Sequence, residues 1–301
     1  MTNMFSSGDA RERRKAFRAG LNSGKIQRLP GAFSPLVARA IAEAGFEGVY
    51  VSGAVVAADL ALPDIGLTTL TEVAGRSRQI ARVTELPVLV DADTGFGEPM
   101  SAARTVSELE DAGVAGCHLE DQVNPKRCGH LDGKAVVPIE DMVRRLGAAV
   151  SARRDENFII CARTDAAGIE GIDAAIDRAK AYAEAGADLI FTEALRTEAD
   201  FEKFRQAVDT PLLANMTEFG KSELIPAQTL ESIGYNAVIF PVTTLRIAMG
   251  QVEAALEEIA ETGTQTGWID RMQHRSRLYE LLRYSEFNVF DQEIFTYRKE
   301  N

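Results

Sequence analysis

The stretch Ala185–Glu193, with the sequence AGADLIFTE, contains the unit from which the rest of the chain can be interpreted. It joins a small residue and a glycine, where a helix is expected to end, to a short apolar run that closes on the carboxylate of Glu193. Glycine is common at helix ends, and short apolar runs are typical of strands buried in a parallel sheet. The amphipathic segment at 172–185, IDAAIDRAKAYAEA, supplies the helix before this strand.

The same order of helix and strand recurs along the chain. Apolar runs of this kind predict strands at about 29–34, 48–53, 87–93, 115–121, 158–165, 188–193, 211–218 and 236–241. Eight alternating strand and helix units in 301 residues are typical of one (β/α)8 barrel. A doubly wound sheet is the alternative, but no Gly-x-Gly-x-x-Gly follows the first strand and the chain has no Walker loop. We therefore predict an α/β fold, a TIM barrel that forms the single domain 1–301.

Two helical segments are expected beside the barrel. The charged segment 9–22 predicts a helix within an N-terminal extension at 1–25. The last segment, 263–301, predicts one or two helices and is rich in aromatic residues, namely Trp268, Tyr279, Tyr284, Phe287, Phe290, Phe295 and Tyr297. So many large apolar groups need a surface on which to be buried. They either cap their own barrel or pack on a neighbouring subunit.

Composition excludes several classes of partner. The net charge of −12 disfavours nucleic acid and anionic membrane surfaces, so no such partner is expected. No apolar run is long enough to cross a membrane, and the polar first ten residues lack the apolar core of a signal peptide. Three cysteines are too few for a disulfide framework, which favours a reducing cytoplasm. Cys117 and Cys161 lie in apolar runs and are expected in the core.

Polar side chains follow most of the predicted strands. They are Tyr50, Ser52, Asp91, Asp93, Glu120, Arg163, Asp165, Glu193, Asn215 and Thr217. The carboxyl ends of barrel strands meet on one face, where catalytic groups concentrate. A single such residue, Asp165 for example, could instead be a helix cap or part of a buried salt bridge. The whole set is hard to explain by stability alone, so we predict an active site on this face.

Asp91 and Asp93 predict a metal site. They are two residues apart on an extended chain, so both carboxylates leave the same face and repel each other unless a cation lies between them. Hard oxygen ligands favour Mg²⁺, with water and substrate completing its shell, and Glu120 is a plausible partner through water. Zinc is disfavoured because the neighbouring Cys128 and His130 have no second Cys/His pair at ligand spacing.

The loop after the fourth predicted strand carries the most reactive groups. Residues 117–134 read CHLEDQVNPKRCGHLDGK, with Lys126 and Arg127 directly before Cys128. Two cations beside a thiol favour its thiolate and make it useful in proton transfer. A connection this long between strand and helix suggests an element that closes over bound substrate. The alternative is a surface loop with an incidental cysteine.

Together these motifs resemble the isocitrate lyase / phosphoenolpyruvate mutase superfamily, and within it the 2-methylisocitrate lyases. The resemblance rests on YVSG (50–53), LPDIGLTTLTEV (62–73), LVDADTGFG (89–97), EDQVNPKRCGH (120–130), ARTDA (162–166), LLANMTEFGK (212–221), FPVTTLR (240–246) and MQHRSRLYE (272–280). It implies a Mg²⁺-dependent barrel, with Mn²⁺ as an alternative metal, that cleaves a di- or tricarboxylate substrate. For the 2-methylisocitrate lyases this means pyruvate and succinate as products, in the methylcitrate cycle of propionate breakdown. It also implies a homotetramer in which C-terminal helices are exchanged.

The resemblance further implies a role for each matching residue. Asp91 and Asp93 hold the metal, with Glu120 bound through water. The substrate contacts are Ser52, Gly53, Ala54, Cys128, Gly129, Arg163, Glu193, Asn215, Thr217, Arg246 and Arg275. Cys128 acts as the general acid in a loop shared with His130, while Asp64 and Tyr50 lie near the reacting centre and Tyr50 is the first choice as base. At the ends of the sixth and eighth predicted strands, Phe191, Ile239 and Pro241 are candidate walls for the methyl group that the resemblance implies for the substrate, and barrel filling is the alternative role for them.

Three other kinds of function compete with a 2-methylisocitrate lyase. A 2,3-dimethylmalate lyase shares the loop motif and is the nearest rival. Phosphoenolpyruvate mutases and phosphonopyruvate hydrolases carry a different loop, with Asn-Ser where Cys-Gly-His (128–130) stands here. A phosphoryl mutase needs no acid thiol, so Cys128 and His130 argue against that function. A non-catalytic barrel would be expected to lack some of the strand-end or loop residues, and none of the metal or loop positions is missing.

Overall fold

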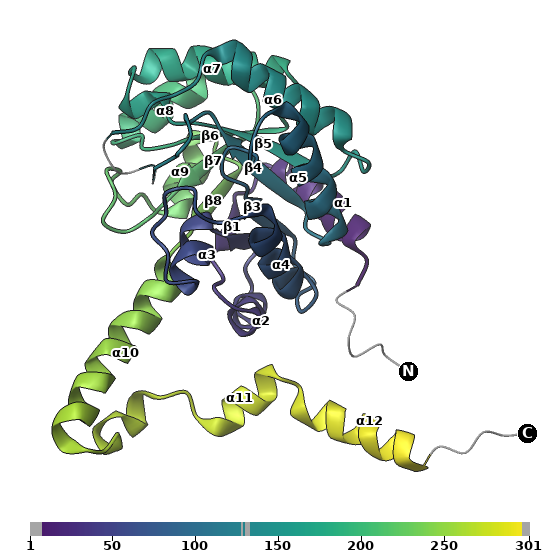
Figure 1. Cartoon of the computed structure of the whole chain (residues 1–301), viewed down its shortest axis with the longest axis vertical. Coiled ribbons are helices and arrows are strands. Elements are labelled where there is room, and N and C mark those ends of the chain that lie inside the picture. The colour runs from purple at the N-terminus through teal and green to yellow at the C-terminus, as the bar shows by residue number, and fades with distance from the viewer. Residues whose placement is uncertain (1–7, 128, 130–132, 297–301) are drawn as a thin grey trace, which may run out of the picture. The chain divides into compact units, whose positions relative to one another are not determined.

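A computed structural model describes residues 8–127, 129 and 133–296, and its centre is an eight-stranded parallel sheet (Figure 1). The strands are β1 (Gln27–Pro30), β2 (Val49–Val51), β3 (Val88–Asp91), β4 (Gly116–Glu120), β5 (Ile159–Thr164), β6 (Leu189–Thr192), β7 (Leu212–Asn215) and β8 (Ala237–Phe240). Their neighbour order is β1-β8-β7-β6-β5-β4-β3-β2. Seven strands lie inside the predicted runs, whereas β1 begins about two residues before the predicted one. The sheet and its helices confirm the (β/α)8 barrel.

The barrel closes between β1 and β2 through a narrow seam. Gly31 and Tyr50 form a single parallel bridge, and Ala32 N donates to Tyr50 O at 2.9 Å. A Cβ added to Gly31 would overlap the carbonyl oxygen of Pro241. Only glycine allows the chain after β1 to approach the backbone after β8 this closely, so Gly31 is required on the β8 side of β1.

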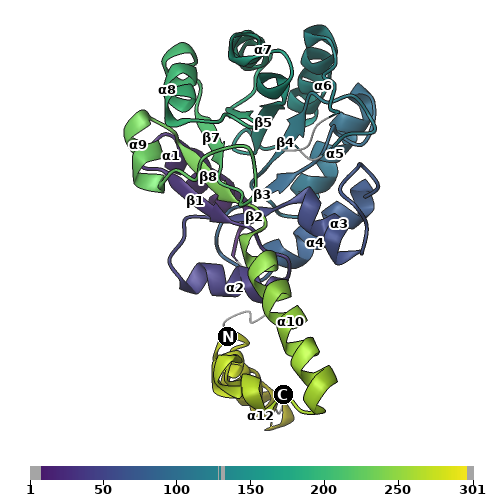
Figure 2. The same cartoon turned by 90° about the vertical axis from the view of Figure 1, so that its left-hand side faces the viewer.

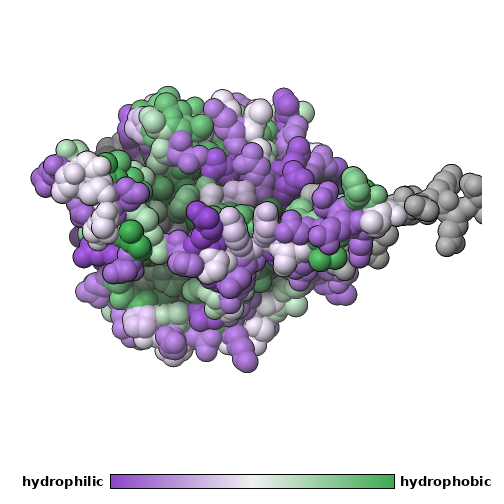
Figure 3. All heavy atoms as spheres, turned by 90° about the horizontal axis from the view of Figure 1, so that it is seen from below, coloured by the Kyte–Doolittle hydropathy of each residue, from purple (hydrophilic) through white to green (hydrophobic). Residues whose placement is uncertain are grey.

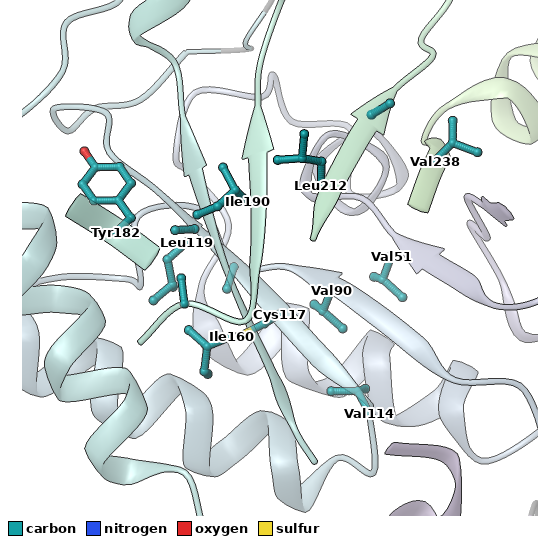
Figure 4. Close-up of a cluster of buried hydrophobic side chains, with 14 of the residues drawn as sticks. Val51, Val90, Val114, Cys117, Leu119, Ile160, Tyr182, Ile190, Leu212 and Val238 are labelled. Carbon is teal, nitrogen blue, oxygen red and sulfur yellow. The ribbon is translucent and has the colours of Figure 1, made fainter. Parts of the chain in front are cut away.

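Two apolar layers hold the sheet. Successive strand residues point to opposite faces, so alternate residues fill different layers. The outward-facing layer packs against the helices and includes Val51, Val90, Cys117, Leu119, Ile160, Ile190, Leu212 and Val238 (Figure 4). The inward-facing layer fills the barrel with Leu29, Tyr50, Leu89, Ala115, Ile159, Cys161, Leu189, Phe191, Leu213, Ala237 and Ile239. Cys117 and Cys161 are both buried free thiols, as expected for core residues.

Helices surround the sheet on its outer side (Figure 2). They are α2 (Pro35–Glu43), α3 (Gly53–Asp59), α4 (Leu70–Ala81), α5 (Pro99–Asp111), α6 (Ile139–Ala152), α7 (Ile172–Glu184), α8 (Glu198–Ala207) and α9 (Ala227–Ile233), and the short 3-10 helix η1 (Ala166–Gly168) precedes α7. Local sequence fixes several of their ends. Thr69 and Glu72 form a reciprocal capping box at the start of α4, which satisfies backbone N–H groups that the helix leaves without partners.

The N-terminal helix α1 (Ala10–Leu21) matches the helix predicted at 9–22 and belongs to the barrel. Its residues Phe17 and Leu21 join the inward-facing apolar layer. Arg14 donates to the carbonyl oxygens of Val114 at 2.9 Å and Glu110 at 2.7 Å, just before β4 begins. The helix therefore covers the amino-terminal end of the barrel, opposite to the carboxyl ends of the strands.

The chain divides into two compact units, one ending at Leu245 and the other beginning at Arg246. The helix α10 (Thr243–Thr262) crosses this boundary, and η2 (Thr266–Arg271), α11 (Arg275–Leu281) and α12 (Tyr284–Thr296) follow it. The second unit thus has more helical pieces than predicted. Within the described residues, neither α10 nor α12 has a buried side chain. Assignment of the segment 263–301 to oligomerisation stays a prediction.

Hydrophilic side chains cover most of the face shown in Figure 3. In the described part of the chain, no helix combines the length and the apolar character needed to span a bilayer.

Candidate active site

Asp91 and Asp93 lie where β3 ends, as predicted, and both are buried. Asp91 accepts hydrogen bonds of 3.1 Å from the backbone N–H groups of Gly53 and Asp93. Asp93 has a left-handed backbone with φ of 46°, a conformation that aspartate tolerates better than most residues. A Cβ on Gly53 would lie 2.9 Å from Asp91 Oδ2, so glycine lets α3 start directly against this carboxylate. The backbone thus holds two carboxylates side by side.

Lys126 reaches this carboxylate pair from the long loop. Its Nζ lies 2.8 Å from Asp93 Oδ1, and it also pairs with Asp64. Burial opposes the charge of Lys126, but Glu120, Asp93 and the other nearby carboxylates outweigh burial and raise the pKa of Lys126. The sequence pointed to Lys126 only as a cation beside Cys128. Its role as partner of Asp93 was missed, because the path of the loop cannot be derived from spacing.

Arg163 is the centre of a second polar cluster. It donates to both oxygens of Asp165, at 2.9 and 3.1 Å. Its Nη1 lies 3.2 Å from Glu120 Oε2, and its Nη2 lies 3.3 Å from Glu193 Oε2. Asn215 Nδ2 donates to both oxygens of Glu193 at 3.3 Å. The ends of β4, β5, β6 and β7 are therefore joined by one buried guanidinium network, in which Asp165 forms the salt bridge considered for it.

Tyr50 and His118 form a buried pair inside the barrel. Tyr50 Oη and His118 Nε2 are 2.7 Å apart, and the two rings stack. Phe191 meets the His118 ring edge-on and lies under the guanidinium of Arg163, 5.1 Å from its ring centre. Burial lowers the pKa of His118 to about 4 and raises the pKa of Tyr50 well above its ordinary value. Both side chains are therefore neutral near pH 7. His118 was not among the predicted site residues, although its alternation with the apolar Cys117 and Leu119 indicates that it faces inward.

The charges of the site fit a divalent cation. The two polar clusters contain the buried carboxylates of Asp91, Asp93, Glu120, Asp165 and Glu193, and their cations are Lys126, Lys134 and Arg163. Burial and the adjacent Asp91 raise the pKa of Asp93 to about 6, and burial raises that of Glu120 despite Arg163 and Lys126. Neither carboxylate oxygen of Glu120 has a hydrogen-bond donor among the described residues.

The geometry of these donors suits Mg²⁺ better than a metal held in a closed cage. No three carboxylate, imidazole or thiol groups of the described residues gather around one point. Mg²⁺ is commonly held by one or two carboxylates, with waters and substrate oxygens completing six positions. Asp91 and Asp93, with Glu120 beside Arg163, match that pattern.

A cavity of about 660 Å³ borders Asp93. Its lining includes Thr68, Thr94, Asn124 and Arg104. Thr68 Oγ1 lies 3.5 Å from Asp93 Oδ2, and Thr94 and Asn124 bond to each other through Thr94 Oγ1 and Asn124 Nδ2 at 2.9 Å. The carboxylate of Asp93 is thus approached by polar groups from this side as well.

The other predicted site residues fall into three groups. Ser52, Gly53, Asn215 and Thr217 are buried at strand ends, with the half-buried Ala54 following Gly53. Cys128 and His130 lie outside the described residues. Arg246 and Arg275 belong to the second unit, so their part in the site stays a prediction.

The candidate walls of a methyl pocket are buried as well. Phe191 and Ile239 are in the inward-facing apolar layer, and Pro241 is buried just after β8. Contact with His118 and Arg163 places Phe191 directly beneath the polar cluster. Its role in substrate choice stays a prediction.

The chain is similar to proteins of one family. The family model of phosphoenolpyruvate phosphomutase matches residues 17–260. A probable 2-methylisocitrate lyase 2 of Corynebacterium glutamicum is 80% identical over 298 residues, which cover 99% of this chain and 97% of that protein. The solved structure of an oxaloacetate acetylhydrolase with 3,3-difluorooxalacetate has a TM-score of 0.90 at 32% identity, covering 97% of this chain and 100% of that one. A 2,3-dimethylmalate lyase structure has a TM-score of 0.88 at 32% identity, with 95% and 96% coverage.

Proposed function

The chain belongs to the phosphoenolpyruvate phosphomutase family, and from that premise we propose that it is a carbon–carbon lyase that cleaves 2-methylisocitrate to pyruvate and succinate. Membership confirms the superfamily resemblance seen in the sequence motifs. The observation that carries the substrate is the 80% identity, over 99% of the chain, to a probable 2-methylisocitrate lyase. The buried carboxylate pair and the Arg163 cluster supply the chemical groups that such a cleavage requires.

The metal is assigned to the carboxylate pair. Asp91 and Asp93 would hold Mg²⁺, or Mn²⁺ in its place, and Glu120 would bind one of its waters. When bound, the metal supplies Lewis acidity to the oxygens of the keto-acid half of the substrate. Lys126 supports this arrangement because its ammonium offsets part of the charge on Asp93 and Asp64.

Substrate carboxylates are assigned to the remaining polar groups. Arg163 and Glu193 would contact the pyruvate half, beside Ser52, Gly53 and Ala54. In the structure the Gly53 N–H already donates to Asp91, so Gly53 also positions that carboxylate. The succinate half would be held by Asn215 and Thr217 together with Arg246 and Arg275. An arginine fork suits this task because it donates two parallel hydrogen bonds to one carboxylate.

Bond cleavage needs a base and an acid on opposite sides of the broken bond. Loss of the substrate hydroxyl proton lets the C–C bond break, which forms the carbonyl of pyruvate and leaves the electron pair on the succinate carbon. The Cys128 thiol would protonate that carbon, with Gly129 and His130 in the same loop. Tyr50 is the proposed base. Since burial raises its pKa, it would have to pass its proton on as it accepts the substrate proton, and the hydrogen bond to His118 offers a partner for that transfer.

A product assay tests the proposal. The protein is incubated with Mg²⁺ and racemic 2-methylisocitrate, and pyruvate and succinate are measured separately. We expect equal amounts of the two. The second candidate, a 2,3-dimethylmalate lyase, is favoured only by the structural likeness at 32% identity, and it would give propionate with pyruvate from dimethylmalate. No pyruvate from 2-methylisocitrate, with turnover of dimethylmalate, oxaloacetate or phosphonopyruvate instead, would contradict the assignment.

The cellular setting is proposed on the same basis. A lyase of this specificity would act in the methylcitrate cycle of propionate breakdown. Cys117 and Cys161 are free thiols, which suits a reducing cytoplasm. The exposed apolar side chains of the second unit support assembly with other copies, and a homotetramer with exchanged C-terminal helices is the proposed form.

A further inference from the structure

The loop that joins β4 to α6 has a firmly tied stem. Val123 N donates to Ala135 O and Val137 N donates to Asp121 O, both at 2.8 Å. Gln122 and Val136 form an antiparallel bridge between these two bonds. These backbone bonds therefore fix the two described ends of the loop side by side.

Two buried side chains at or next to this stem bond to the residues that flank position 128. Gln122 is 1% exposed, and its amide donates to Arg127 O and accepts from Arg127 N, both at 2.8 Å. On the other flank, Lys134 donates to Gly129 O and to Asp165 Oδ1, the latter at 2.8 Å. A primary amide that bonds both polar groups of one peptide residue fixes that residue's orientation as well as its place.

Lys134 connects its flank of the loop to the Arg163 cluster. The Asp165 carboxylate that receives Lys134 also receives both donors of Arg163. A Cβ on Gly129 would overlap Arg163 Nη2 and Glu193 Cγ, so the loop backbone rests directly on those two side chains. The Lys134 side chain is only 4% exposed, and its ammonium donates to one carbonyl and one carboxylate.

A purely stabilising salt bridge would explain the pairing of Lys134 with Asp165. It would not account for the second bond, in which Lys134 also donates to Gly129 O. Gly129 is the residue that packs on Arg163 and Glu193. A buried ion pair is in any case weak evidence for stability, because desolvation of the two charges offsets much of their attraction. Together, the two bonds of Lys134 set the position of the loop backbone relative to the Arg163 cluster.

We propose that Lys134 and Gln122 are positioning residues of the lyase reaction: Lys134 holds Gly129 against Arg163 and Glu193, and Gln122 fixes the backbone of Arg127 on the other flank of position 128. This proposal rests on the function proposed above. Neither residue needs to touch the substrate. They act on the protonation step, for which Cys128 must be correctly placed. Their loss therefore lowers kcat more than it changes KM.

The kinetic test compares Lys134→Met and Lys134→Arg with the parent protein, using 2-methylisocitrate and Mg²⁺. Methionine keeps the length and apolar stem but removes the charged donor. We expect kcat to fall at least about tenfold, the scale of a lost charge-assisted hydrogen bond, with KM changed less. Arginine keeps a cation that can reach both acceptors and should recover part of kcat. The matched control is Lys203→Met, which breaks a surface Lys–Asp pair of 2.6 Å and should leave both constants unchanged.

A second readout does not depend on the substrate. Cys117 and Cys161 are 0% exposed, so iodoacetamide labelling followed by peptide mass spectrometry reports on Cys128. We expect Lys134→Met and Gln122→Met to label Cys128 at a rate at least threefold different from the parent, while Lys203→Met labels at the parent rate. If the parent fails to cleave 2-methylisocitrate, the proposed function fails and labelling still tests the hold on the loop.

Unchanged labelling in both variants would overturn the proposal, as would an unchanged kcat in Lys134→Met. Thermal melting of each variant separates loss of fold from loss of position. If Lys134→Met does not fold, Gln122→Met acts on the other flank and decides the question by the same labelling rate.

Discussion

Lys126 Nζ lies 2.8 Å from Asp93 Oδ1 although the two residues belong to different strand–loop segments. The same ammonium pairs with Asp64, so one cation from the long loop joins the end of β3 to the segment that precedes α4. Asp93 is the carboxylate whose pKa burial and Asp91 raise to about 6. The Lys126 ammonium lowers the pKa of Asp93, but burial and Asp91 outweigh it.

Activity is expected to require Mg²⁺ held by this pair. Exhaustive chelation should abolish turnover and readdition of Mg²⁺ should restore it, because the carboxylates cannot polarise a keto-acid oxygen themselves. Mg²⁺ should also raise the melting temperature of the parent protein and not of Asp93→Ala, since a ligand stabilises only the state that binds it. Asp173→Ala, at a carboxylate whose side chain is 83% exposed, is the control. Full activity after chelation would refute the assignment.

Replacement of Cys128 by serine should separate binding from turnover. A hydroxyl is a far weaker acid than a thiol, so protonation of the succinate carbon slows while the carboxylate contacts persist. We expect most of kcat to be lost and product-induced thermal stabilisation by pyruvate and succinate to be retained. Cys117→Ala, at a buried thiol outside the site, tests for a general effect of removing a cysteine. Turnover near that of the parent in Cys128→Ser would exclude the acid role.

Deletion of residues 265–301 should break the oligomer and lower solubility. In the described residues, α12 has no buried side chain, and Tyr284, Val289 and Phe295 are 51%, 54% and 92% exposed. We expect another copy of the chain to cover these apolar groups. Removal of the tail would then expose the apolar surface of that copy, which the tail had covered. Light scattering of the truncated protein measures the change, with a chain lacking only 297–301 as control. A truncated protein of the same mass and solubility would contradict the prediction.

Substrate choice should favour the extra methyl group of 2-methylisocitrate over isocitrate. An apolar pocket that accepts a methyl contributes about 1–3 kcal/mol, or roughly 10–200-fold in kcat/KM. We therefore expect at least about a tenfold preference, measured with both substrates side by side. Phe191→Leu should reduce that ratio if its ring, which lies beneath Arg163, also forms a wall of the pocket. Equal values, or a preference for isocitrate or dimethylmalate, would show that the substrate assignment is wrong.

The close approach of Gly31, after β1, to Pro241, after β8, should be sensitive to one methyl group. In Gly31→Ala the new Cβ meets the carbonyl of Pro241, which cannot retreat without disturbing β8. Overpacking of this kind costs about 1–3 kcal/mol, or more against backbone, so the free energy of unfolding should fall by at least that amount. Gly147→Ala is the matched control, because nothing lies within 4 Å of its added Cβ in α6. Denaturant titration of both variants gives the comparison, and equal stabilities would count against a close backbone contact at Gly31.

Much of the fold was predictable because it depends on local patterns. The run DLIFTE and its counterparts carry the apolar content of buried strands, and their flanking glycines end the helices, so seven of the strands could be located from the sequence. The exception is β1, whose residues QRLP lack such a run and pair with β8 only through long-range register. The pair Asp91 and Asp93 was likewise predictable, because both follow the apolar run of β3. The extended chain expected through both residues was wrong, since β3 ends at Asp91 and Asp93 has φ of 46°.

Long-range pairings could not be predicted in this way. Tyr50 and His118 meet across 68 positions of the chain, and Lys134 reaches Asp165 across 31, because strand register and the path of a loop bring them together. Local sequence specifies which groups are present and which face of a strand they occupy. Their partners depend on how eight strands are staggered around one barrel, since burial of that assembly, not spacing in the chain, fixes the distances between charges.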